Sequence, residues 1–177
     1  YNVSQATAGN RPTFVTNAAN FNAVLRFTSS GSTHTFMDFG SMGISSNSDL
    51  NFFAAVKPTT VTGGGLTDGA GGNIVDRNST TVSTNPLLDF KLLSTNRFGF
   101  QKRNDASGGL GGVSTTSSIS TTTMQLVNYY RDYSVQYGIL YNGAQEATLA
   151  DADGALTVPN LRIGAHYDGN AGLTGDF

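Results

Sequence analysis

The last third of the chain, residues 124–177, reads MQLVNYYRDYSVQYGILYNGAQEATLADADGALTVPNLRIGAHYDGNAGLTGDF. A β-rich segment ends in YNG at 141–143, and Asn-Gly tolerates the positive φ angles that a tight hairpin turn needs. LRIG at 161–164 follows as another strand, and a last one begins at Leu173. Strands that follow one another through turns, without crossover helices, predict antiparallel sheets packed face to face.

Short apolar runs between Gly-, Ser-, Thr- and Asn-rich turns continue through the rest of the chain, and no segment shows the 3.6-residue period of a helix. The strongest run, LNFFAAVK at 50–57, is nearly all apolar, which predicts a central strand covered on both faces. Further strands are expected at 22–27, 34–39, 73–77, 87–93, 98–102, 124–130, 135–141 and 144–149.

Composition narrows the class of protein. The chain has 177 residues and no cysteine, which predicts one domain without disulfides, thiolate metal sites or cysteine nucleophiles and favours a bacterial or viral source. The net charge is −2, and the densest basic pair, Lys102-Arg103, is interpreted as a solvated strand end, so nucleic-acid binding is not expected. The longest apolar run, 52–56, has strand length, so no membrane insertion is expected.

The segments, taken in order, resemble laminin-G-like domains of the concanavalin A-like lectin and glucanase superfamily. In that family a strand ending in YvNG precedes an l.iG strand and a final f.GdiaEi strand. RPTFVTNAANFNAVLRF at 11–27 resembles the family's opening segment, LNFFAAVKP at 50–58 its ftvfawvkP strand, and GNIVDR at 72–77 the strand after it. The chain departs from the pattern at 27–29, where FTS replaces FDG, and it contains no tryptophan.

The resemblance implies an all-β fold, a concanavalin A-like jelly-roll sandwich of two antiparallel sheets with almost no helix, over residues 1–177 as a single domain. The chain begins at Tyr1 and stops at Asp176-Phe177, inside the family's last motif. We therefore expect an excerpt of a longer protein that lacks part of its final strand. A missing closing strand would leave one sheet edge unpaired.

Catalysis is not expected. Glucanases of the superfamily carry Glu-x-Asp-x-Glu on one strand to flank the glycosidic bond, whereas this chain has a single glutamate, Glu146. His34 and His166 are its only histidines, and it has no Gly-x-Ser-x-Gly nucleophile elbow. The glycines between 63 and 72 predict a long loop, but no Gly-Lys-Ser/Thr follows them, so a phosphate-binding loop is not indicated either.

Calcium is the metal that the residues could hold, because it needs only carboxylate, amide and carbonyl oxygens. The candidate ligands are Asp151 with Asp153, and Asp168 with Asn170. Sandwich domains of the superfamily often carry calcium at a loop edge, which favours this hypothesis. Two turn-forming aspartates before a glycine are the alternative reading of the DADG run at 151–154.

Glycan binding is suggested by tyrosine, which offers an aromatic face and a hydroxyl group. Tyr133, Tyr137 and Tyr141 would share one face of a strand, and that face could be either core or binding platform. His166, Tyr167 and Asp168, in the loop after LRIG, are the better exposed candidates for ligand contact.

The resemblance implies a non-enzymatic adhesion or recognition module of a large extracellular bacterial surface protein. Its partners would be a glycan or a surface protein, together with neighbouring domains of the same long chain. The alternative is a structural spacer or decoration domain of a filament, surface layer or phage particle, and a degenerate glycosidase relative is a minor third reading.

Overall fold

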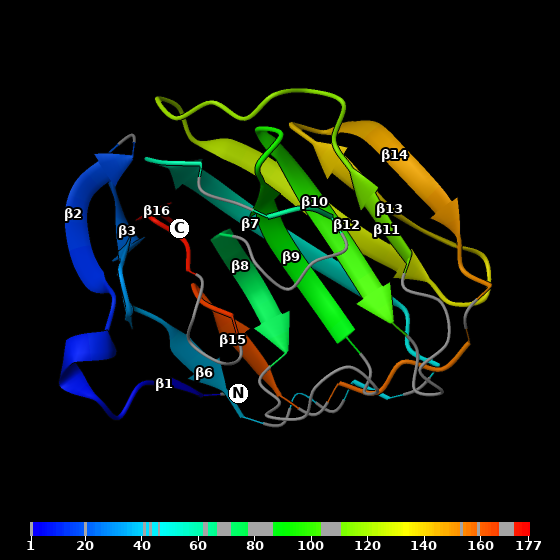
Figure 1. Cartoon of the computed structure of the whole chain (residues 1–177), viewed down its shortest axis with the longest axis horizontal. Coiled ribbons are helices and arrows are strands. Elements are labelled where there is room, and N and C mark those ends of the chain that lie inside the picture. The colour runs from blue at the N-terminus through cyan, green and yellow to red at the C-terminus, as the bar shows by residue number, and fades with distance from the viewer. Residues whose placement is uncertain are drawn as a thin grey trace.

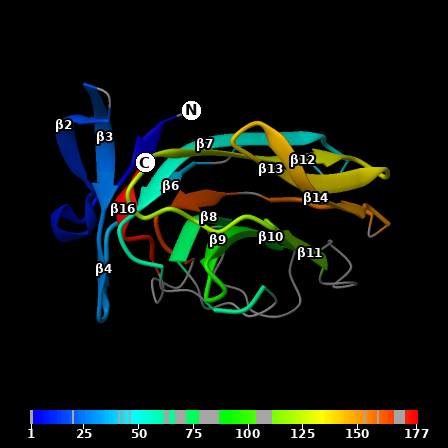
Figure 2. The ribbon, with the colours of Figure 1, turned by 90° about the horizontal axis from the view of Figure 1, so that it is seen from above.

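The computed structural model describes residues 2–19, 21–40, 42, 44–45, 47–61, 64–66, 72–77, 87–103, 111–152, 154–158, 160–166 and 172–177. These residues form two seven-stranded antiparallel sheets that pack face to face (Figures 1 and 2), as expected for a jelly-roll sandwich. Helical structure among them is confined to a 3-10 turn at Ala8–Asn10. None of the described segments is a helix with the length and apolar character of a membrane span.

The order of strands defines a front and a back sheet. The front sheet consists of β1 (Val3–Ser4), β6 (Met37–Phe39), β15 (Leu161–Ile163), β8 (Gly72–Arg77), β9 (Leu87–Leu93), β10 (Arg97–Arg103) and β11 (Gly111–Ser114). The back sheet consists of β14 (Ala144–Ala150), β13 (Gln136–Tyr141), β12 (Gln125–Asp132), β7 (Leu50–Pro58), β16 (Gly175–Asp176), β3 (Asn22–Phe27) and β2 (Thr13–Ala19). A small separate hairpin joins β4 (Ser29–Ser30) and β5 (Thr33–His34).

The expected strands are present, with two corrections. The run at 34–39 is divided between β5 and β6 instead of forming one strand. The run at 50–57 is central, as β7 lies between β12 and β16, but the expectation that both of its faces are covered is wrong. Asn51, Phe53 and Ala55 are exposed on the outer face, and Phe53 keeps 65% of its surface in solvent. Because nearly every residue of this segment is apolar, the sequence does not show which residues alternate between the two faces.

The core lies between the sheets, and it shows whether the tyrosines of the late strands form part of the core or a binding platform. Tyr137 is fully buried, and its ring meets Phe100 edge-on at a centroid distance of 5.7 Å. Tyr141 is half-buried, and its hydroxyl donates a hydrogen bond of 2.7 Å to Gln125 Oε1. These two rings therefore serve the core rather than a binding platform.

The C-terminal strand β16 is placed in the middle of the back sheet. Asp176 pairs with Arg26 on β3 and with Lys57 on β7, and its buried carboxylate accepts from Arg26 Nε at 2.6 Å and lies 3.3 Å from Lys57 Nζ. The hydrogen bond from Arg26 is the main cause that lowers the pKa of Asp176. Phe177 then bonds Leu25 through both its backbone N–H and its C=O. Among the described strands, the edges of the back sheet are therefore β14 and β2.

Gly164 and Gly143 give a matched test of packing against backbone strain. Both have positive φ, +92° and +86° respectively, but a Cβ at Gly164 would lie 2.2 Å from the Phe27 ring, whereas Gly143 has open space around it. Gly143→Ala should cost about 1–2 kcal/mol for the left-handed backbone alone. Gly164→Ala should cost at least about 3 kcal/mol, because overpacking adds to that strain. Urea unfolding of both variants measures the difference, and equal losses would refute the packing role of Gly164.

Candidate functional site

The outward face of the front sheet is lined by polar side chains. On β9, Leu88 and Phe90 belong to the core, so Asp89 and Lys91, which alternate with them, face away from it. Strand pairing extends this face across five strands. One polar row in register consists of Asp38, Arg162, Asp76, Asp89 and Gln101.

Hydrogen bonds connect the middle of this polar row. Asn73 Nδ2 donates to Asp89 Oδ1 at 2.8 Å, and Lys91 Nζ lies 3.0 Å from both Asp89 Oδ2 and Gln101 Oε1. All four residues are at most 1% exposed. Burial, and secondarily the charge of Asp89, raise the pKa of Tyr129 on the core side of the sheet. The middle of the row is thus a sealed layer of paired charges and not an open cleft.

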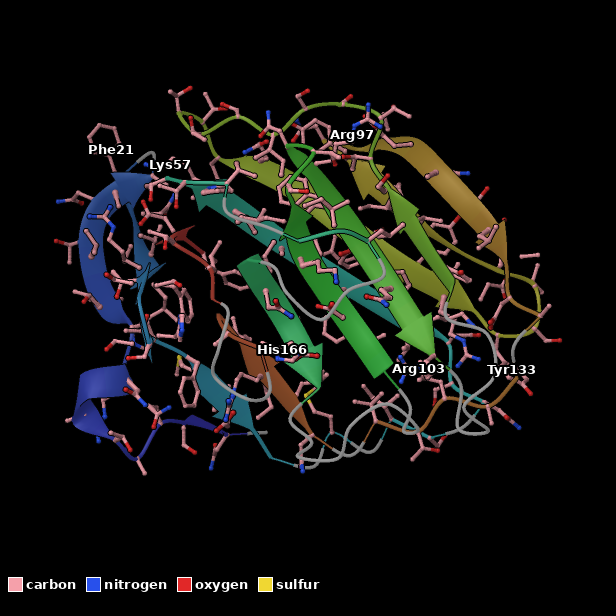
Figure 3. All side chains as sticks on the ribbon, in the orientation of Figure 1. Phe21, Lys57, Arg97, Arg103, Tyr133 and His166 are labelled. Atoms are coloured by element: carbon pink, nitrogen blue, oxygen red, sulfur yellow. The ribbon has the colours of Figure 1, made fainter. Side chains whose placement is uncertain are left out.

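His166 joins the other end of the row (Figure 3). Its Nε2 lies 3.7 Å from Asp76 Oδ2, and its backbone carbonyl accepts from Arg162 Nη1 at 3.3 Å. The residue is only 7% exposed, so the expectation of an exposed histidine is wrong. Tyr167 and Asp168 lie outside the described residues, and their role in ligand contact stays a prediction.

Asp151 lies in a buried ion cluster. Its carboxylate bonds Lys102 Nζ, accepts from Arg131 Nε at 2.7 Å and accepts from the Ser134 N–H at 3.2 Å. Lys102 is fully buried, so its interpretation as a solvated strand end is wrong. Burial works to raise the pKa of Asp151, but the hydrogen bonds and charges of Lys102 and Arg131 outweigh it and lower that pKa.

The calcium hypothesis stays a prediction. Asp153, Asp168 and Asn170 lie outside the described residues, and Asp151 already binds two cationic side chains. Within the part of the chain that the structure describes, no group of three His, Asp or Glu side chains could hold a metal ion.

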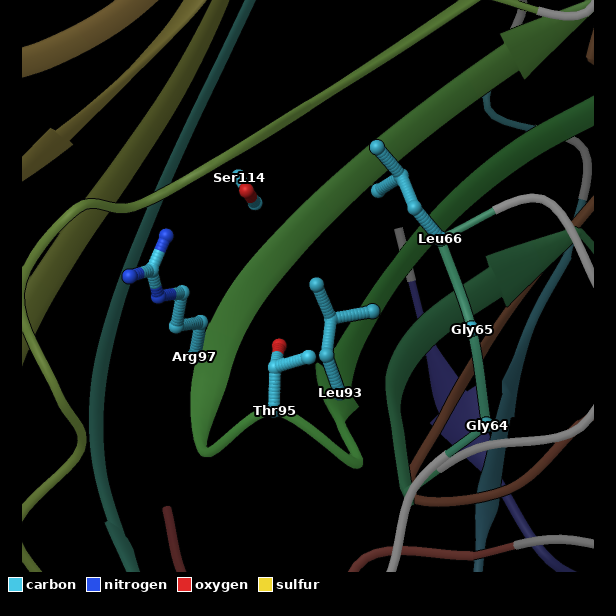
Figure 4. Close-up of a pocket in the computed structure, with 7 residues that line it drawn as sticks. All are labelled: Gly64, Gly65, Leu66, Leu93, Thr95, Arg97 and Ser114. Atoms are coloured by element: carbon cyan, nitrogen blue, oxygen red, sulfur yellow. The ribbon is translucent and has the colours of Figure 1, made fainter.

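An open pocket of about 400 Å³ lies beside the sealed row, at the β9–β10 end of the front sheet (Figure 4). We call it the Arg97 pocket. Its lining consists of Gly64, Gly65, Leu66, Leu93, Thr95, Arg97 and Ser114. Leu66 can lie across the sheet because β10 and β11 carry glycines there: a Cβ at Gly99 or Gly112 would come within 3.0 Å of its side chain.

Three polar side chains of the Arg97 pocket are free to bind a ligand. Thr95 lies in the β9–β10 turn, Arg97 begins β10, and Ser114 ends the neighbouring β11 (Figure 4). Among the described residues, none of these three side chains forms a hydrogen bond or an ion pair. Leu66 and Leu93 supply an apolar wall beside them. A few free polar groups against an apolar wall are typical of small-ligand sites.

Glu146 anchors the segment that follows Ser114. From β14, its Oε2 accepts hydrogen bonds from the N–H groups of Thr116 and Ser117 at 2.6 and 2.8 Å, and its Oε1 accepts from Ser117 Oγ. Burial works to raise the pKa of Glu146, but the hydrogen bonds from Ser117 and Thr116 outweigh it and lower the pKa from 4.5 to about 2. The single glutamate of the chain therefore holds one wall of the pocket in place.

Sequence reasoning missed both the polar row and the Arg97 pocket. A signal for the row was present in LLDFKLL at 87–93, where Asp89 and Lys91 alternate with apolar residues inside a strand. Nothing in the local sequence indicated the pocket, because Leu66, Arg97 and Ser114 meet only through strand pairing and loop placement.

Comparison with known proteins supports the fold. No protein-family model and no curated protein sequence matches the chain. Domains LG4-5 of the mouse laminin α1 chain superpose with a TM-score of 0.66 at 13% identity, covering 98% of this chain and 42% of that one. The endo-β-1,4-glucuronan lyase of the fungus Trichoderma reesei gives 0.57 at 12% identity, covering 97% and 78%. The sialidase CBM40 of Ruminococcus gnavus, bound to α2,3-sialyllactose, gives 0.56 at 14% identity, covering 79% and 87%.

These identities establish similarity of fold alone. Together with the two antiparallel sheets, they confirm an all-β concanavalin A-like jelly-roll sandwich. Binding modules and an enzyme share this architecture, so the function must be argued from the site.

Asp151→Asn should test the ion cluster. The substitution keeps the shape of the side chain but removes the negative charge beside Lys102 and Arg131, so we expect a loss of about 3–5 kcal/mol of unfolding free energy. The exposed Asp132→Asn is the control and should stay within about 0.5 kcal/mol of the wild type. A calcium-dependent melting temperature that disappears in Asp151→Asn would instead favour a calcium ligand.

Glu146→Gln should destabilise the protein in a pH-dependent way. Because the folded pKa of about 2 lies below the ordinary 4.5, the stabilisation is fully present above pH 4.5 and disappears as the pH falls toward 2. The difference in unfolding free energy between wild type and variant should therefore be larger at pH 6 than at pH 2.5. A difference that does not change with pH would contradict the role of the ionised carboxylate.

Proposed function

We propose that this chain is a non-enzymatic saccharide-binding module and that the Arg97 pocket holds the sugar. The observation that carries the proposal is the convergence of Thr95, Arg97 and Ser114, whose polar groups have no partner among the described residues, around an open pocket. A sugar offers many hydroxyl groups and an apolar C–H face. The hydroxyl and guanidinium groups of the pocket can hydrogen-bond the sugar hydroxyls, and Leu66 and Leu93 can contact the C–H face.

The pocket is also of a suitable size. Its volume of about 400 Å³ lies within the range of small-ligand sites, which is roughly 300–1,000 Å³. The CBM40 module that shares the fold was solved with sialyllactose bound, which supports a saccharide as the ligand class. Identity to that module is 14%, so the contacts must be this chain's own.

A binding role is favoured over catalysis by the burial of the carboxylates. Hydrolysis of a glycosidic bond by the usual mechanism needs two carboxyl groups that reach the substrate. Asp76 and Asp89, the neighbouring carboxylates of the polar row, are at most 1% exposed, and none of the described residues that line the Arg97 pocket is acidic. The glucuronan lyase has the same sandwich fold, but the burial of the carboxylates in this chain supports binding rather than catalysis.

The proposal includes an extracellular setting, in which the module forms part of a longer bacterial surface protein with neighbouring domains. Support comes from the composition, with only 12% charged residues and no cysteine, and from the saccharide-bound structural neighbour. A spacer or decoration domain without any ligand is the reading that this proposal opposes.

A saccharide array tests the proposal. The chain should bind at least one neutral or acidic saccharide class, and Thr95→Trp, which fills the pocket from its rim, should weaken that binding at least about tenfold. Thr148→Trp on the exposed strand β14 is the matched control and should bind like the wild type. Circular dichroism checks that both variants are folded.

The remaining outcomes separate the alternatives. No saccharide bound by the wild type, with calcium or with EDTA, would favour the spacer reading. Binding that survives Thr95→Trp but is lost in Tyr167→Ala would move the sugar site to the loop after β15. Hydrolysis or elimination of a polysaccharide by the chain would refute a purely binding role.

A further inference from the structure

Almost all cationic side chains that the structure describes already have a partner. Asp176 binds two of them, Asp151 binds two more, and Asp89 and Asp38 bind one each. Those six are Arg26, Lys57, Lys102, Arg131, Lys91 and Arg162. Arg11 donates to the backbone carbonyls of Gln5 and Ala6, and Arg103 also has a partner.

Arg97 is the exception among the cations whose side chains the structure describes. It forms no hydrogen bond or ion pair there, although it is half-buried. It lies at the end of β10 opposite to Arg103 (Figure 3), and its side chain borders the Arg97 pocket (Figure 4). No acidic residue is among the described residues of the pocket lining, so the charge of Arg97 is not balanced by any of them.

We infer that the Arg97 pocket selects a saccharide that carries a carboxylate, and that Arg97 is the residue that determines this specificity. The inference rests on the proposed function and names the ligand class of the same site. A guanidinium group presents planar paired N–H donors that fit the two oxygens of a carboxylate. In a half-buried position this interaction is less screened by water than on an open surface.

The neighbouring groups fit the rest of such a ligand. Thr95 and Ser114 can bond sugar hydroxyl groups near the carboxylate site, because Thr95 lies in the turn just before Arg97 and Ser114 ends the strand that pairs with β10. Leu66 and Leu93 cannot bond a charged group and would contact the ring instead. Arg97 is the one charged side chain among the described lining residues, which predicts recognition of one acidic sugar unit rather than a generally polyanionic chain.

Isothermal titration calorimetry on the full chain tests this inference. The probes are a β-1,4-linked tetramer of glucuronic acid, the same tetramer with its carboxyl groups reduced to alcohols, and the reduced tetramer carrying sulfate esters. We expect the wild type to bind the carboxylate form about tenfold or more tightly than the reduced form, as a charge-assisted hydrogen bond would give. Raising the salt concentration should weaken only the acidic probes.

Three variants assign the preference to Arg97. Arg97→Gln should bind the acidic and reduced tetramers equally, while Arg97→Lys should keep only part of the preference, since an ammonium group lacks the planar fork. Arg11→Gln changes the net charge by the same amount at a distant position and should keep the full preference. The Arg97 side chain forms no hydrogen bond or ion pair with any described residue, so its variants should unfold close to the wild-type midpoint.

The opposing outcomes are distinct. Equal binding of the acidic and reduced tetramers by the wild type, or a preference that survives Arg97→Gln, overturns the carboxylate assignment and leaves the saccharide module standing. A stronger response to sulfate than to carboxylate also overturns it. Failure to bind any saccharide in the array overturns the proposed function and this inference together.

Discussion

Burial of charge on both faces of the front sheet is the constraint on which the rest of the structure depends. In most sandwiches the outward face of a sheet meets water, but Asp89 and Lys91 are almost completely removed from solvent. A buried ion must be paired and hydrogen-bonded, because its desolvation otherwise costs several kcal/mol. The strands therefore bring Asn73 and Lys91 into contact with Asp89, and Gln101 into contact with Lys91. For the same reason, the buried carboxylate of Asp151 is paired with both Lys102 and Arg131.

The pairing of the other described charges is what makes Arg97 notable. The other cationic side chains that the structure describes have partners, so a half-buried guanidinium group with none among the described residues borders a site that can accept an anion from outside. Its surroundings are built by residues that lie far apart in the chain. Glycines at 99 and 112 admit Leu66, and Glu146 on the opposite sheet anchors the segment after Ser114.

The fold of this protein does not by itself identify its function. The sandwich is shared with a laminin domain pair, a sialidase module and a glucuronan lyase, at identities of 12–14%. Such a scaffold keeps its sheets and changes its surface chemistry, so the architecture alone does not select among adhesion, spacing and catalysis. The burial of Asp76 and Asp89 and the open Arg97 pocket are the features on which the proposed binding role rests.

The sequence by itself determined the all-β class, the strand positions and the antiparallel sandwich, because two-residue alternation and turn chemistry are local properties of the chain. It did not predict that the outer face of β7 is exposed at Phe53, that Lys102 and His166 are buried, or that Arg97 borders a pocket. Only the tertiary structure decided these points, since burial and partnership depend on strands distant in sequence. Asp176 meets Arg26 across 150 residues, and Asp38 meets Arg162 across 124. No local pattern encodes such a meeting, because it follows from the order of strands within the sheets.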